Sequence, residues 1–91
     1  MNSELLTLGE NIRRARRKLN ISQEALAERC GLHRTYVCDI ERGARNVSFG
    51  SLLKLAQGLK TNISELMRNV ETGLRPPISG SSPPPTPNQL R

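Results

Sequence analysis

The chain contains almost no aromatic residues, with no Trp, one Tyr and one Phe among its 91 residues. All-β cores tend to use much aromatic ring area, so this shortage argues against a sandwich or barrel. Leu, Ile, Ala, Arg and Glu are plentiful, and these residues favour helices. We therefore expect a compact all-α domain. A domain of this size has only a modest core, and oligomerisation is a common supplement to it.

Groups suited to catalysis or metal binding are also scarce. The sole histidine, His33, has no obvious nucleophile or carboxylate partner, and a structural zinc site would need four ligands. The sequence thus predicts no enzyme activity, no metal and no cofactor. With no signal peptide and no disulfide framework, Cys30 and Cys38 are expected to be reduced thiols in the cytoplasm. No apolar stretch approaches the roughly 20 residues that cross a bilayer, so we expect no membrane contact.

Positive charge is concentrated near the amino terminus. Fourteen Lys and Arg against eight Asp and Glu give a formal net charge of +6, and five of the basic residues fall within residues 13–18. Such a cluster suits a polyanion such as nucleic acid. The alternative interpretation is an ordinary solvated helix face.

The composition changes sharply near residue 75. All six prolines lie in residues 76–91, together with Gly, Ser, Thr and Asn. This composition predicts a domain over residues 1–74 and a disordered tail over residues 75–91. The proline run could also serve as a polyproline ligand, although a flexible terminus is the simpler interpretation.

Apolar spacing and capping residues predict five helices. The first follows an apolar face at spacings of three and four, made by Leu5, Leu8, Ile12, Ala15 and Leu19. The second covers residues 23–30, between a Ser22 cap and a turn at Gly31. The third covers about residues 33–42 and ends at Gly43.

The two remaining helices complete the expected core. Ser48 is a plausible cap for a fourth helix, which buries Leu52, Leu55, Ala56 and Leu59. Asn62 and Glu65 resemble a capping box that opens a fifth helix, which runs past Val70 and ends near Gly73.

The third helix has the face that a DNA reader needs. Val37 and Ile40 would hold it against the core, and four side chains would then point outward: Arg34, Thr35, Cys38 and Asp39. Short polar or basic groups near a helix N-terminus can reach base edges in the major groove. Periodicity alone describes an ordinary amphipathic surface helix equally well.

Several motifs in order decide between these interpretations. They are SQEALA at residues 22–27, GL at 31–32, RTYV at 34–37, IERG at 40–43 and RNVS at 45–48, followed by the apolar run at 52–59. Together they resemble the Xre or phage-repressor-like helix-turn-helix family over about residues 8–67. The stretches at 34–36 and 42–48 look most like controller proteins of restriction-modification systems.

The resemblance implies roles for residues around the third helix. Arg34 would read guanine, Thr35 and Cys38 would lie beside it, and Asp39 would accept from cytosine or orient Arg34 or Arg42. The expected contacts with phosphates or the minor groove come from Arg17, Gln23, His33, Tyr36, Arg42, Arg45 and Asn46.

Other residues are expected to have structural roles. The resemblance implies an ion pair between Arg16 and Glu41, which would tie the third helix to the first. Phe49, Leu53 and Met67 exceed what a five-helix core requires, so they are expected to form the interface of a homodimer.

The expected function is that of a cytoplasmic transcription regulator, encoded by a prokaryote, phage or plasmid. It would bind double-stranded DNA as a homodimer on a two-fold symmetric operator, possess no cofactor, and could contact RNA polymerase. A controller of a restriction-modification system is the leading interpretation. An antitoxin that binds a toxin and its own promoter, or a phage-type repressor, is the alternative.

Overall fold

The computed structural model describes residues 3–70, and these residues form five helices with no strand among them. The helices are α1 (Ser3–Lys18), α2 (Gln23–Cys30), α3 (Arg34–Glu41), α4 (Phe49–Gly58) and α5 (Ile63–Leu66). The expected all-α fold is confirmed. The predicted tail and the domain boundary near residue 74 lie outside the described residues.

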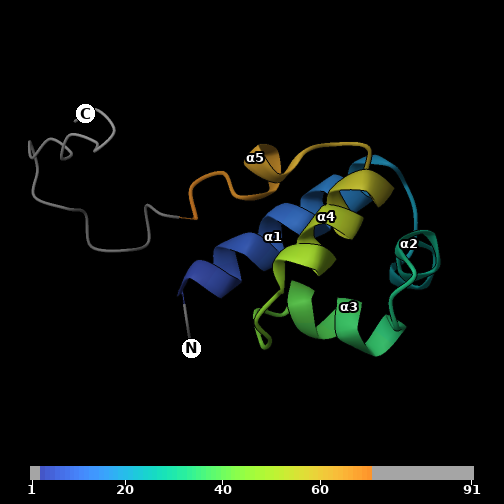
Figure 1. The fold of residues 1–91 in the computed structure, drawn as a ribbon, viewed down its shortest axis with the longest axis horizontal. Coiled ribbons are helices and arrows are strands. Elements are labelled where there is room, and N and C mark those ends of the chain that lie inside the picture. Colours follow the sequence, from blue (N-terminus) through green and yellow to red (C-terminus); the bar gives the residue numbers. More distant parts are fainter. Residues whose placement is uncertain (1–2, 71–91) are drawn as a thin grey trace, which may run out of the picture.

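The helices pack around one apolar core. Helix α3 contacts α1 and α2, whereas α4 lies against α2 and α5 (Figure 1). The fully buried side chains of this core include Ile12, Leu26, Val37, Ile40 and Leu55, which come from the first four helices. Burying each such side chain stabilises the fold by roughly 1.5–3 kcal/mol.

The turn between α2 and α3 is built from a cap and a glycine. The Ser22 side chain accepts a hydrogen bond from the Ala25 amide, which starts α2. Gly31 ends the helix with φ of 68°, a left-handed conformation that glycine adopts at little cost. After only Leu32 and His33, α3 begins at Arg34, so the second and third helices are joined by a tight turn.

The fifth helix is shorter than the sequence predicted. Its cap is as expected, because the Asn62 side chain accepts from the Glu65 amide at 2.8 Å. However, α5 ends at Leu66, and turns carry the chain on to Val70. Asn69 has a φ of 64°, which a continuous helix does not allow. The prediction of a helix running past Val70 is therefore wrong, although Leu66 and Val70 are both buried.

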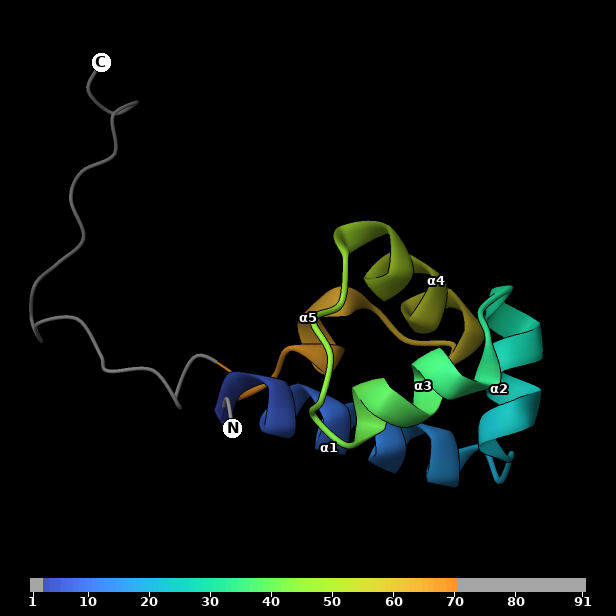
Figure 2. The ribbon, with the colours of Figure 1, turned by 90° about the horizontal axis from the view of Figure 1, so that it is seen from below.

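The packing leaves one helix displayed on the surface. Seen from below, α3 lies in front of the bundle, with α1 along one side and α4 along the other (Figure 2). Val37 and Ile40 face the core and are almost completely buried. The opposite side of α3 is therefore available to a partner.

Candidate nucleic-acid interface

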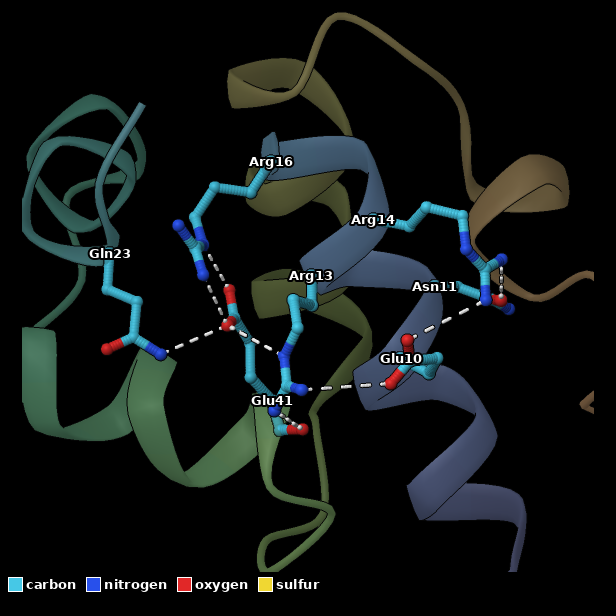
Figure 3. Close-up of polar contacts among 7 residues, drawn as sticks. All are labelled: Glu10, Asn11, Arg13, Arg14, Arg16, Gln23 and Glu41. Carbon is cyan, nitrogen blue, oxygen red and sulfur yellow. Dashed lines mark hydrogen bonds and ion pairs between the residues drawn. The ribbon is translucent and has the colours of Figure 1, made fainter. Parts of the chain in front are cut away.

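A buried carboxylate fixes the position of α3. The side chain of Glu41, at the end of α3, is fully buried, and Arg16 of α1 reaches it with two hydrogen bonds. Arg16 Nε donates to Glu41 Oε2 at 2.7 Å and Nη2 donates to Oε1 at 3.0 Å (Figure 3). The hydrogen bond to Glu41 raises the pKa of Arg16. The ion pair that the resemblance implied is thus present.

Two further side chains complete this cluster. Arg13 Nε lies 3.7 Å from Glu41 Oε1, and Gln23 Nε2 donates to the same oxygen at 3.0 Å (Figure 3). Gln23 is the first residue of α2, so the buried carboxylate of Glu41 joins α1, α2 and α3. The resemblance implied that the Gln23 amide contacts a phosphate. In the structure one of its N–H groups is committed to Glu41, which leaves the second for another acceptor.

The basic cluster at residues 13–18 is divided by these contacts. Arg13 and Arg16 turn toward Glu41, and Arg14 lies 3.8 Å from Glu10. Arg17 and Lys18 are exposed. The cluster therefore contributes to the positive surface with fewer side chains than its sequence suggests.

The outward side of α3 carries the four side chains expected there. Arg34 and Thr35 are exposed, while Cys38 and Asp39 are half-buried. His33 precedes the helix as its N-cap residue, but its side chain makes no capping hydrogen bond. Arg34 makes no ion pair with any residue in the range 3–70. Its guanidinium is thus available at the N-terminal end of the displayed helix.

Asp39 has two arginine partners in the structure. Its Oδ1 lies 2.7 Å from Arg42 Nη2, and its Oδ2 lies 3.7 Å from Arg45 Nη2. The bond to Asp39 raises the pKa of Arg42. The sequence left Arg34, Arg42 and a cytosine as alternatives for this carboxylate. Of these two arginines the structure pairs Asp39 with Arg42, and it adds Arg45.

The loop after α3 lies against an aromatic ring. The guanidinium carbon of Arg45 sits 5.2 Å from the centre of the Tyr36 ring, within the range of a cation–π contact. The Tyr36 hydroxyl donates to Ser51 Oγ at 3.2 Å, which connects α3 to α4. Asn46 is exposed nearby. The sequence did not single out Ser51, because only the fold brings it to Tyr36.

The expected dimer residues are unequally exposed. Phe49 is 68% exposed and Leu53 is 40% exposed, both on α4. Met67 is half-buried and packs against the core. Leu6, which the sequence did not single out, is 43% exposed on α1. The strongest apolar exposure is therefore at the start of α4.

Residues 3–70 were also compared with the requirements of a reactive thiol, a metal site and a membrane span. Cys30 is buried and Cys38 is half-buried, and both are free thiols. Burial raises the pKa of the Cys30 thiol, which keeps it protonated. Within residues 3–70 no cluster of three or more His, Cys, Asp or Glu side chains could hold a metal ion. None of the helices there has the length and apolarity to span a membrane.

Two short helices at a tight turn, with the second displaying an exposed arginine and threonine at its N-terminal end, define a helix-turn-helix DNA-binding protein. The sequence profile of the helix-turn-helix family matches residues 12–66. The chain belongs to this family.

Two similar proteins within this family are named control proteins. The chain is 48% identical to control protein C.SmaI of Serratia marcescens over 60 residues, which are 66% of this chain and 71% of that protein. It is 45% identical to control protein C.BamHI of Bacillus amyloliquefaciens over 67 residues, which are 72% and 83% of the two chains.

The solved structure of a controller protein is also similar to this chain. The restriction-modification controller protein C.AhdI from Aeromonas hydrophila superposes with a TM-score of 0.67 at 45% identity. The match covers 68% of this chain and 94% of that one. The resemblance to restriction-modification controllers, first drawn from the motifs, is therefore confirmed.

Proposed function

We propose that this protein is a transcription regulator of the restriction-modification controller type, which binds a two-fold symmetric operator as a homodimer. The observation that carries the proposal is the outward side of α3, where Arg34 and Thr35 are exposed at the helix N-terminus. The buried pair of Arg16 and Glu41 holds that helix in place. A rigid support is what a base-reading side chain requires.

Base reading is assigned mainly to Arg34. A guanidinium can donate two parallel hydrogen bonds to O6 and N7 of guanine in the major groove. Thr35 and Cys38 lie on the same side of α3, where they can contact neighbouring bases, and Asp39 completes this face. The sequence preference of the protein would thus come from about one turn of helix.

Contacts with the DNA backbone are assigned to the residues around α3. Gln23 and His33 lie at the N-terminal ends of α2 and α3, where amide groups and the helix dipole also attract phosphate. The remaining assigned contacts come from Arg17, Tyr36, Arg42, Arg45 and Asn46. These residues would set the register of the protein on DNA.

Dimerisation is assigned to the apolar surface of α4 and the segment after α5. Phe49 and Leu53 expose large side chains, and Met67 borders the core. A two-fold axis through this surface would pair it with its own copy and place two α3 helices on successive half-sites. The interface thereby predicts a symmetric operator.

We infer the regulatory role from the similar proteins that are named control proteins. On this proposal the protein acts in the cytoplasm without enzymatic activity, and it contacts RNA polymerase at promoters that it activates. The test is a gel shift of the full chain on the DNA upstream of its own gene, with random duplex as competitor. Specific retardation supports the proposal, most strongly where methyltransferase and nuclease genes are adjacent. Equal binding to both duplexes contradicts it, and an adjacent toxin gene would indicate an antitoxin.

A further inference from the structure

The Asp39 carboxylate is shared between two arginines, one oxygen to each. Arg42 lies 2.7 Å from Oδ1 and Arg45 lies 3.7 Å from Oδ2. The Asp39 side chain is 21% exposed, whereas those of Arg42 and Arg45 are 60% and 52% exposed. The carboxylate is thus partly enclosed, with a guanidinium facing each of its acceptor atoms.

The contacts of Asp39 extend beyond α3. Arg45 also sits over the Tyr36 ring at 5.2 Å, and the Tyr36 hydroxyl donates to Ser51 of α4. Tyr36, Asp39, Arg42 and Arg45 line one shallow hollow on the surface. The loop after α3 is therefore held to the displayed helix by Asp39 and Tyr36 together.

Asp39 lies among several positively charged side chains. Arg34, Arg42 and Arg45 carry three positive charges on or beside the outward side of α3. Within α3, Asp39 is the acid that shares this surface, because Glu41 is buried against α1. Arginines bind phosphates of any sequence, so unrestrained guanidinium groups add affinity that does not depend on the bases. A carboxylate that engages two of them opposes the random component.

We propose that Asp39 is a specificity-determining residue that restrains Arg42 and Arg45 and weakens sequence-independent binding to phosphates. The inference rests on the proposed function. It differs from base reading by Asp39, because both carboxylate oxygens already face guanidinium groups. Under this arrangement a larger share of the affinity comes from Arg34 at the base edges.

The test compares Asp39→Asn with the unmodified chain, since this variant removes the charge and preserves the shape. Affinities for the operator and for a random duplex are measured by fluorescence anisotropy at several salt concentrations. We expect the random-duplex affinity to rise about fivefold or more, because the freed arginines can then bind phosphates. The salt slope should steepen by about one for each additional phosphate that is neutralised. Operator affinity should change less than twofold, because base contacts by Arg34 already fix how the protein sits on the operator, so the specificity ratio falls.

A matched control removes the same charge elsewhere. Glu28 is an exposed carboxylate on α2, and Glu28→Gln should change random-duplex affinity less than twofold. A second control introduces Asp39→Asn into a variant that already carries Arg42→Gln and Arg45→Gln. In that background Asp39→Asn should no longer raise the random-duplex affinity. Thermal unfolding establishes that each variant is folded. Asp39→Ser provides a second charge-removing variant if Asp39→Asn is not folded.

Three results would overturn the inference. One is an unchanged random-duplex affinity in Asp39→Asn, and another is an equal rise in Glu28→Gln. The third is a tenfold loss on the operator with no gain on random DNA, which would make Asp39 a base reader. Failure of the proposed function is a separate result, because the unmodified chain would then not prefer the operator over random duplex.

Discussion

Gly9 of α1 lies so close to α3 that a Cβ at this position would be 2.5 Å from the carbonyl oxygen of Ile40 and 2.7 Å from that of Glu41. Both neighbours are backbone atoms and cannot rotate away. The glycine therefore sets how near the displayed helix can approach α1, next to the pair of Arg16 and Glu41.

Gly9→Ala should destabilise the fold despite the better helix propensity of alanine. The clash should cost about 1–3 kcal/mol, more than the gain of up to about 1 kcal/mol from replacing a helical glycine. Urea unfolding measures the difference. Gly50→Ala on α4 is the matched control, because a Cβ there meets no atom within 4 Å, and it should be neutral or mildly stabilising. Similar behaviour of the two variants would contradict the close packing.

Glu41→Gln should be strongly destabilising. It leaves Arg16, whose side chain is only 13% exposed, without its counter-charge, and breaking a buried pair costs about 3–5 kcal/mol. Glu65→Gln makes the same change in an exposed pair, where Glu65 lies 3.1 Å from Arg68, and should cost less than about 1 kcal/mol. Unfolding in urea compares both with the unmodified chain. A destabilisation of less than about 1 kcal/mol for Glu41→Gln would refute the structural role of the pair.

Arg34→Ala should reduce specificity. Removing a bidentate hydrogen bond to guanine should cost about 1–3 kcal/mol per half-site on the operator and hardly change binding to random DNA. Arg45→Ala should weaken both duplexes by similar factors, with a salt slope shallower by about one for each phosphate that is no longer neutralised. Binding assays on the two duplexes separate these roles. Equal proportional reductions in affinity for Arg34→Ala would show that the recognition face is wrongly assigned.

Operator affinity should fall steeply with salt. About six neutralised phosphates per dimer predict a slope near −5 in a plot of log affinity against log salt concentration. Titrations between low and moderate salt measure the slope directly. A slope near zero would exclude binding dominated by phosphate contacts, and with it the assignment of this surface to nucleic acid.

Phe49→Glu or Leu53→Glu should convert the proposed dimer to monomers. Each places a charge on the apolar surface of α4, where a buried unpaired charge is strongly unfavourable. Lys54→Glu introduces a negative charge at an exposed position on another side of the same helix and should leave the dimer intact. Sedimentation velocity at high micromolar concentration distinguishes the cases. An unmodified chain that is strictly monomeric there would rule out the interface.

Local sequence determined where most helices begin and end. Ser22, Ser48 and Asn62 each accept a hydrogen bond from an amide three residues on, as their cap positions predicted. Gly31 adopts the left-handed turn. The apolar periodicity also placed Val37 and Ile40 inward and Arg34 outward. These features depend on neighbouring residues, so the chain encodes them within one or two turns of helix.

Tertiary structure decided what depends on residues far apart in the sequence. It turned Arg13 and Gln23 toward Glu41, gave Asp39 the partners Arg42 and Arg45, and required glycine at position 9. It also ended α5 at Leu66, where capping and spacing predicted a longer helix. Side chains of one type can take several partners, and only packing brings one of them within hydrogen-bonding distance. For that reason the sequence determined which residues of α3 point outward, and the fold determined which of the charged side chains there have ion-pair partners.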